Sequence, residues 1–220
     1  MAPDLRGYGE SDKPRGVAAY RVERLAADVA ALVGALGRDR ADLVGHDWGG
    51  HIAWYVAMWH AERVRRLALL NIPHPQRFVR ALLTLRQLRK SWYLFFFQLP
   101  FFAERFMSDA ILRKQFRYMT ARRDAYSDEE IRINLEAMRD RTGPVNYYRA
   151  ALRHPALWKK IEHETLVIWG ESDRWLGPEL AEPDPRWVPH ARVEHIPDAS
   201  HWVQADAPAR VNELLLGFLR

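Results

Sequence analysis

A glycine-framed hexapeptide between an apolar run and a helical segment places the strongest constraint on how this chain folds. Residues 41–44 form a short, largely apolar run, residues 45–50 are Gly-His-Asp-Trp-Gly-Gly, and residues 51–62 have a helical composition. Residues 64–72 form a second strand-like run after a short connection. Strands and helices that alternate over such short connections predict a parallel sheet flanked by helices.

The same alternation continues on both sides of this unit. Apolar spacing predicts helices at 21–36 and 208–219 and buried strands at 165–169 and 192–196. From Pro73 to about residue 163 the chain is helical, aromatic and basic, without a clear strand. We therefore expect an α/β fold in two parts: a mostly parallel sheet domain of residues 1–75 and 164–220, and a helical insertion of residues 76–163.

Composition excludes several classes of protein. There is no cysteine, so disulfide scaffolds and thiol chemistry are ruled out. The longest apolar run, residues 92–102, is interrupted by Gln98 and Pro100 and is shorter than the roughly 20 residues that span a bilayer. The first residues also lack the layout of a signal peptide. We expect a cytoplasmic protein, a monomer or a homodimer, without a membrane partner.

The net charge of +5 does not predict nucleic-acid binding, because the basic residues are interleaved with acidic ones along the chain. The densest basic group lies in residues 80–90, among leucines at 82, 83, 85 and 88. We interpret this segment as one amphipathic helix with its leucines on the apolar side and its arginines in solvent. No nucleic-acid partner is expected.

The hexapeptide has the pattern Gly-x-nucleophile-x-Gly, which marks a sharp strand-to-helix turn. Asp47 occupies the position of the nucleophile, and glycines are expected around it because side chains there collide with neighbouring backbone. The N-terminus of the following helix favours a carboxylate and, later, an oxyanion. The alternative is an ordinary glycine-rich turn that carries a solvated aspartate.

Two later residues favour the catalytic interpretation. Asp173 follows the strand predicted at 165–169, and His201 follows the strand predicted at 192–196. Open parallel sheets place their sites at this carboxyl edge, and nucleophile–acid–histidine is the chain order of a known hydrolase triad. Each residue alone is more often the cap of a loop, and Glu171 is a rival to Asp173, but the three placements together predict a catalytic site.

The residue types indicate the chemistry. A serine at position 47 would attack acyl groups, whereas a carboxylate is suited to displacement at an alkyl carbon, which forms an ester with the enzyme. His201 would then activate water against the carbonyl carbon of Asp47, while Asp173 holds the imidazole tautomer. The backbone N–H of Trp48, which follows the nucleophile, is the expected oxyanion donor.

With these residues, the sequence resembles the epoxide hydrolase branch of the α/β-hydrolase superfamily. The resemblance lies in residues 4–12 (Asp-Leu-Arg-Gly-Tyr-Gly-Glu-Ser-Asp), 45–50, and 71–75 (Asn-Ile-Pro-His-Pro). It implies the α/β-hydrolase fold, a helical cap formed by the insertion, a hydrophobic small-molecule epoxide as substrate, and no cofactor or metal.

The resemblance also implies two cap tyrosines that hydrogen-bond the epoxide oxygen and help to protonate it. Tyr93 and Tyr148 stand in the two segments that look like the tyrosine-bearing cap motifs. A tyrosine hydroxyl, with an ordinary pKa near ~10, is protonated at neutral pH and can donate. The alternative is that both rings are packing aromatics, because Tyr147 and the phenylalanines at 95–97 are close by in the sequence.

Haloalkane dehalogenation is a second candidate reaction, since it also uses an aspartate at this turn. There the indole N–H after the nucleophile helps to bind halide, a role that Trp48 could fill. Such enzymes need a second halide donor and no tyrosine pair. The two tyrosine segments therefore favour the epoxide.

The sequence departs from the family in one respect. The family's first strands carry a His-Gly-x-Pro loop that supplies a second oxyanion N–H, and no such loop occurs here. We expect a fold shortened at its N-terminus, with either a mis-assigned start or a true truncation. Loss of one oxyanion donor typically costs ~10²–10³ in rate. A third hypothesis is therefore an inactive hydrolase homologue that acts as a binding protein.

Overall fold

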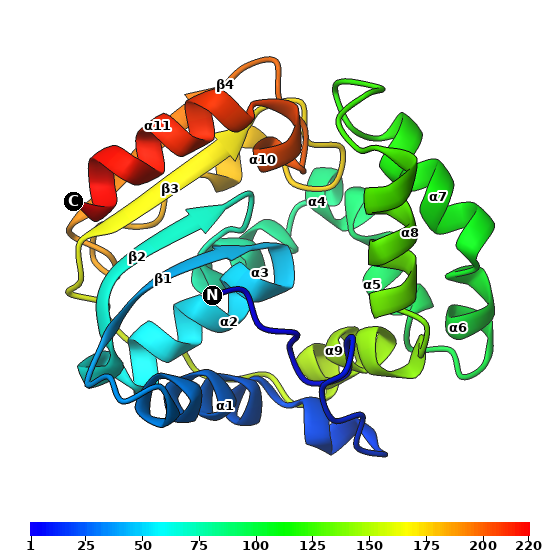
Figure 1. Cartoon of the computed structure of the whole chain (residues 1–220), viewed down its shortest axis with the longest axis horizontal. Coiled ribbons are helices and arrows are strands. Elements are labelled where there is room, and N and C mark those ends of the chain that lie inside the picture. Colours follow the sequence, from blue (N-terminus) through cyan, green and yellow to red (C-terminus); the bar gives the residue numbers. More distant parts are fainter.

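The computed structural model describes all 220 residues, and a four-stranded parallel sheet lies at its centre (Figure 1). The order of strands across the sheet follows the sequence: β1 (Ala41–His46), β2 (Val64–Leu70), β3 (Thr165–Gly170) and β4 (Ala191–Ile196). His46 is in register with Leu70, and Gly170 with Ile196. The loops that leave all four strands therefore begin at one edge, which confirms the predicted fold class.

Helices cover the two faces of this sheet. Residues Leu67, Leu69, Val167 and Trp169 pack on one face against α1 (Val22–Ala35) and α2 (Asp47–Trp59). The alternate residues Ala68, Leu70, Leu166 and Ile168 pack on the other face against α10 (Val203–Asp206) and α11 (Pro208–Leu219). Side chains alternate between faces along a strand, so central strands buried on both sides are apolar throughout. Each large buried side chain contributes about 1.5–3 kcal/mol.

Strand β1 is one of the two edge strands of the sheet and pairs on one side only. Val44 lies opposite Ala68 in β2, on the sheet face that α11 covers over β2 and β3. The Val44 side chain is 48% exposed, because α11 packs over β2 and β3 and does not reach β1. Unpaired edges of this kind can pair with a further strand.

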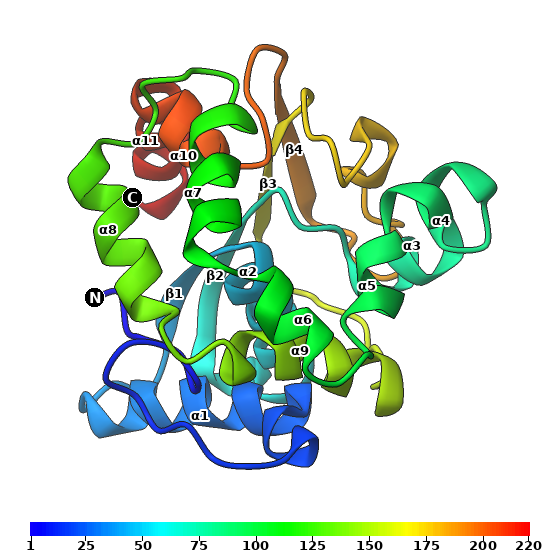
Figure 2. The same cartoon turned by 90° about the vertical axis from the view of Figure 1, so that its right-hand side faces the viewer.

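The chain between β2 and β3 contains helices and no strand, and its helices stand to one side of the sheet (Figures 1 and 2). Its helices are α3 (Pro75–Ala81), α4 (Leu85–Lys90), α5 (Trp92–Phe96), α6 (Phe102–Phe106), α7 (Asp109–Tyr118), α8 (Asp128–Ala137) and α9 (Thr142–Arg153). They share a small core of their own around Phe97, Phe116 and Ile131. These helices run from Pro75 to Arg153, within one residue of the start of the insertion expected at 76–163. The division into a core and a cap domain stays a prediction.

Several expected boundaries differ from the structure. Strand β2 ends at Leu70, because Asn71 takes a positive φ of 42°. Helix α2 begins at Asp47 itself and ends at Trp59. The single helix expected at 80–90 is wrong: α3 ends at Ala81, a turn follows, and α4 begins after Thr84, whose side chain accepts from the Gln87 N–H.

Short 3₁₀ turns complete the connections: η1 (Val17–Tyr20), η2 (Ala61–Arg63) and η3 (Pro178–Leu180). None of the helices combines the length and the apolar composition that crossing a bilayer requires.

Candidate active site

The turn between β1 and α2 holds Asp47 in a strained conformation. Its φ is 49°, in the left-handed region that non-glycine residues rarely adopt. A Cβ on Gly45 would lie 2.6 Å from the backbone of Gly50, and a Cβ on Gly50 would lie 2.4 Å from Ile72. These two glycines are sterically required, as expected. Gly49 is not, because a Cβ there would meet nothing within 4 Å.

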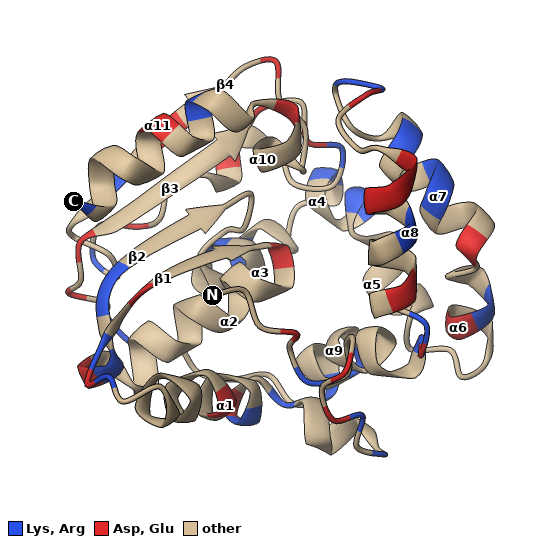
Figure 3. Cartoon of the chain, viewed as in Figure 1, with Lys and Arg blue, Asp and Glu red and all other residues tan.

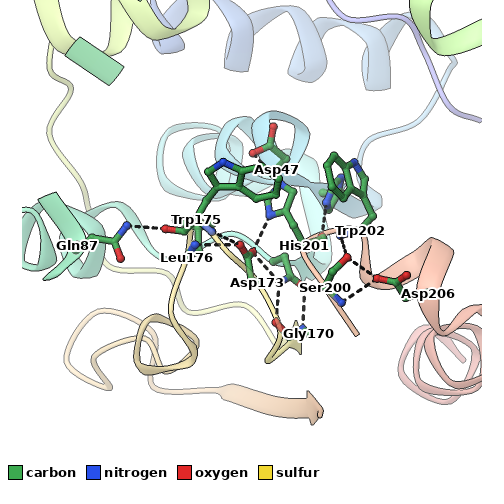
Figure 4. A network of polar contacts seen from close by, with 12 residues as sticks. Asp47, Gln87, Gly170, Asp173, Trp175, Leu176, Ser200, His201, Trp202 and Asp206 are labelled. Carbon is green, nitrogen blue, oxygen red and sulfur yellow. Dashed lines mark hydrogen bonds and ion pairs between the residues drawn. The ribbon is translucent and has the colours of Figure 1, made fainter. Parts of the chain in front are cut away.

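Three side chains from separate loops form a row at the carboxyl edge of the sheet (Figure 4). The Nε2 atom of His201 lies 3.5 Å from a carboxylate oxygen of Asp47, and its Nδ1 lies 2.7 Å from Oδ2 of Asp173. The rival Glu171 points elsewhere, with its carboxylate 3.1 Å from His195. The structure thus brings together the three residues that the sequence singled out.

The carboxylate of Asp173 is fully buried and held by four donors, one of them His201. Its Oδ1 accepts the backbone N–H groups of Trp175 at 2.8 Å and Leu176 at 3.0 Å, and its Oδ2 accepts the side-chain amide of Asn71 at 3.0 Å. Burial alone would raise its pKa, but the charge and hydrogen bond of His201 and the backbone N–H groups of Leu176 and Trp175 lower it. Asp173 is therefore a fixed negative charge behind the imidazole.

Asp47 and His201 form an ion pair in the resting protein. Burial would raise the pKa of Asp47, but the hydrogen bond and charge of His201 lower it to about 2. Burial would lower the pKa of His201, but Asp173 and then Asp47 raise it to about 10. The Asp47 side chain is still 39% exposed, so a reactant can reach it.

Two tyrosines of the helical insertion lie beside this row. The ring of Tyr148, in α9, lies edge-on to the Trp48 indole at 4.9 Å between centroids. The ring of Tyr93, in α5, lies 5.8 Å from that of Tyr148. The neighbouring Tyr147 differs, because it is in the main core and its hydroxyl donates to the backbone carbonyl of Arg6 at 2.7 Å.

The environment keeps both tyrosines protonated. Burial raises the pKa of Tyr93 and of Tyr148 well above the ordinary value, and the negative charge of Asp47 raises both further. The Trp48 side chain opposes this shift at Tyr148 by hydrogen bonding. A hydroxyl that is protonated and close to a carboxylate can donate to an oxygen placed between them.

Hydrogen bonding by the main-chain N–H of Trp48 makes a small contribution to the lowered pKa of Asp47. The role of this N–H as the oxyanion donor stays a prediction.

Two supporting residues were missed by sequence reasoning. The Nε2 of His46 lies 2.8 Å from the backbone carbonyl of His201, and because a carbonyl only accepts, His46 is the donor. Asn71 joins the ends of two strands, since its side chain donates to Gly170 O at 3.1 Å and accepts the Gly170 N–H at 2.8 Å. A polar residue at the carboxyl end of each strand was the available signal.

Aromatic rings enclose His201. The indoles of Trp175 and Trp202 each lie 5.5 Å from the imidazole and 5.4 Å from one another, and Trp202 also contacts Phe116 of the helical insertion. The surroundings of the site are therefore apolar on this side (Figure 4).

Comparison with protein families agrees with this geometry. A family model described as the alpha/beta hydrolase fold matches residues 1–208. The chain belongs to that family.

This member of the hydrolase-fold family is similar in sequence to bacterial and animal proteins along its whole length. It is 35% identical to the AB hydrolase superfamily protein YfhM of Bacillus subtilis, over all of this chain and 80% of that protein. It is 34% identical to epoxide hydrolase 4 of Homo sapiens, over all of this chain and 64% of that protein. It thus spans less than two thirds of the human relative.

Solved structures show the same similarity. The crystal structure of the Bacillus megaterium epoxide hydrolase with an inhibitor matches with a TM-score of 0.86 at 27% identity, over 98% of this chain and 81% of that one. An epoxide hydrolase from metagenomes of hot environments matches with a TM-score of 0.81 at 32% identity, over 100% and 80%. These matches confirm the resemblance to the epoxide hydrolase branch.

Proposed function

We propose that this protein opens epoxides with water, using Asp47 as nucleophile, His201 as base, Asp173 as its orienting acid, and Tyr93 and Tyr148 as proton donors. The observation that carries the proposal is the row Asp47–His201–Asp173 with two protonated tyrosines beside Trp48, the residue that follows Asp47. A carboxylate, a base and two acids are thus contributed to one region of the structure. In this scheme the helical insertion serves as the cap.

In the first step an oxygen of Asp47 attacks an epoxide carbon. A carbon–oxygen bond forms, the ring carbon–oxygen bond breaks, and the ring oxygen takes a proton from a tyrosine hydroxyl. The low pKa of Asp47 keeps the nucleophile ionised, and the raised pKa values of Tyr93 and Tyr148 keep the donors protonated. The product is an alkyl ester of Asp47.

In the second step His201 takes a proton from water, and the hydroxide adds to the carbonyl carbon of Asp47. The Trp48 N–H stabilises the tetrahedral oxyanion. As this intermediate collapses, the leaving alkoxide takes the proton of the new carboxyl group, so the diol is released and the ion pair of Asp47 with protonated His201 is restored. Ester formation removes the charge of Asp47, one of the causes of the high pKa of His201. The pKa of His201 therefore falls once the ester exists, and the imidazolium gives up its proton, which restores the tyrosinate left by the first step to tyrosine and leaves a neutral imidazole to act as the base.

The tyrosine pair favours this reaction over haloalkane dehalogenation. A departing halide needs N–H donors and no proton, whereas an opening epoxide needs an acid. Tyr93 and Tyr148 belong to the helical insertion, and the Trp48 side chain packs edge-on against Tyr148. The rings of Trp175 and Trp202 support a hydrophobic epoxide as the substrate class.

A single-turnover experiment in heavy-oxygen water tests the mechanism. An excess of the protein is mixed with an aryl epoxide and then digested, and the masses of its peptides are measured by mass spectrometry. We expect one heavy oxygen in the peptide that contains Asp47, ordinary oxygen in the diol, and neither label nor diol with Asp47→Ala. Diol that carries the label while the peptide does not would mean direct attack by water and would overturn the Asp47 role.

The tyrosine roles need a separate comparison. Tyr93→Phe and Tyr148→Phe should each slow ester formation at least about tenfold, because general acid catalysis contributes roughly 10²–10⁴-fold. Tyr147→Phe is the matched control, since it removes a neighbouring hydroxyl that bonds to backbone, and it should leave turnover unchanged.

The two other hypotheses have their own outcomes. Halide release from chloroalkanes without diol formation would favour the dehalogenase. Retention of an aryl epoxide or diol by the protein without turnover would favour the binding protein.

A further inference from the structure

The outer surface of the helical insertion carries large apolar side chains that no other part of the chain covers. We call the exposed residues Leu85, Leu88, Trp92, Phe95, Phe102 and Phe106 the aromatic face. Soluble proteins rarely expose contiguous apolar patches of large side chains, and such patches commonly mark an interaction surface.

The residues of the aromatic face lie together. From Leu85 to Phe95 they are separated by three or four residues, which places them on one side of a helical path. The ring of Phe106, in α6, lies 6.3 Å from Trp92, and Phe96 lies 5.0 Å from Phe106. Helices α5 and α6 therefore present a joint aromatic surface.

The turn between these two helices extends the face. Phe101 is 84% exposed and has a φ of 65°, a left-handed conformation that is unfavourable for a bulky residue. The neighbouring Phe102 is 68% exposed. Two adjacent phenylalanines thus extend into solvent at this turn, where they gain little free energy from burial within the chain.

Basic residues predominate beside the aromatic face, and the acidic Glu104 of α6 is paired with Arg149. Residues 75–103 contain five basic residues and no acidic one, and the α4 ribbon shows blue without red in Figure 3. The ion pairs here use Arg80 and Arg86, through Asp184 and Glu179. Arg89 and Lys90, on α4, have no ion-pair partner.

We propose that the aromatic face docks on the surface of an anionic lipid bilayer. Tryptophan and phenylalanine side chains insert at the boundary between headgroups and acyl chains, while lysine and arginine attract anionic headgroups. The short helices α5 and α6 would lie flat at that surface, with Phe101 and Phe102 deepest. A second copy of this chain fits less well, because a symmetric contact brings the same basic residues against each other.

This proposal departs from the sequence expectation of no membrane partner, because it concerns a surface contact and not a membrane span. It does not depend on the proposed function. If both hold, docking brings α5, which also carries Tyr93, to the surface in which hydrophobic epoxides dissolve.

Vesicle sedimentation tests the docking. The full chain is mixed with vesicles of phosphatidylcholine alone or with about one third phosphatidylglycerol. We expect binding to the anionic vesicles only, weakened by 0.5 M salt. Phe101→Ser/Phe102→Ser and Arg89→Glu/Lys90→Glu should each weaken it more than about tenfold, since each basic residue near an anionic surface contributes roughly fivefold.

Matched controls lie away from the face. Leu157→Ser/Leu216→Ser removes two exposed leucines, and Arg38→Glu/Arg40→Glu reverses two exposed charges beside β1. Both should bind as the parent chain does. Absence of binding to anionic vesicles, or equal losses in the controls, would overturn the proposal. The proposal would also be overturned if the chain did not bind vesicles but formed a dimer that Phe101→Ser/Phe102→Ser dissociates.

Discussion

The side chain of Asn71, at the end of β2, donates a hydrogen bond to the buried carboxylate of Asp173 at 3.0 Å while it also pairs with the backbone of Gly170. One amide thereby fixes the end of β3 and the acid that orients His201. It can do so because asparagine tolerates the positive φ found at this position.

We expect Asn71→Ala to lower the free energy of unfolding by about 2–4 kcal/mol, because it leaves the Gly170 N–H buried without an acceptor and places alanine at a positive φ. Urea denaturation measures this loss. Asn134→Ala is the control: its amide bonds to a helix carbonyl at the surface, so about 1 kcal/mol or less should be lost. Equal losses would mean that the bridge contributes little.

The two adjacent glycines after Asp47 should respond in opposite ways to the same substitution. Gly50→Ala should cost about 1–3 kcal/mol, because its Cβ would overlap Ile72 and the Gly45 carbonyl. Gly49→Ala has open space in a helix, so it should stabilise the protein by up to about 1 kcal/mol. Thermal unfolding of the two variants is compared, and a lower midpoint for Gly49→Ala would contradict the geometry.

His46 should act as a positioning residue if the proposed function holds. His46→Ala removes the hydrogen bond that fixes the His201 backbone, and displacement of a base by about 1 Å can cost as much as ~10²-fold in rate. We expect kcat for an aryl epoxide to fall at least tenfold with little change in KM. His163→Ala removes a similar histidine–carbonyl contact with Ala61, far from Asp47, and should leave kcat unchanged.

The ion pair of Asp47 and His201 predicts a pH dependence of stability. The pKa of His201 is raised from 6.5 to about 10, so its stabilisation is complete below pH 6.5 and is lost as pH rises through about 10. The pKa of Asp47 is lowered to about 2, so its contribution is lost only as pH falls below about 4.

The free energy of unfolding should therefore decline between pH 6.5 and 10 by about 1–3 kcal/mol, a value that allows for solvent screening at the partly exposed Asp47. Urea titrations across this range measure the decline, and His201→Gln should flatten it. The histidines at 46, 51 and 74 have pKa values lowered to about 4 and titrate below this window. An equal slope in His201→Gln would assign the decline to other groups.

The sequence by itself determined the elements of the sheet and the identity of the row. Apolar runs of strand length and helical spacing are local properties, so all four strands were predicted to within a few residues. Parallel strands also share one carboxyl edge, so Asp47, Asp173 and His201 could be expected to meet.

Only the tertiary structure decided which side chains support that row and which leucines are exposed. His46 and Asn71 act through the backbones of His201 and Gly170, contacts that span more than 90 residues and leave no local pattern. The leucines of residues 80–90 were expected to lie on the apolar side of one amphipathic helix. Leu83 and Leu85 are instead in solvent, because a turn divides that segment and burial depends on what packs against a helix, which its own periodicity does not specify.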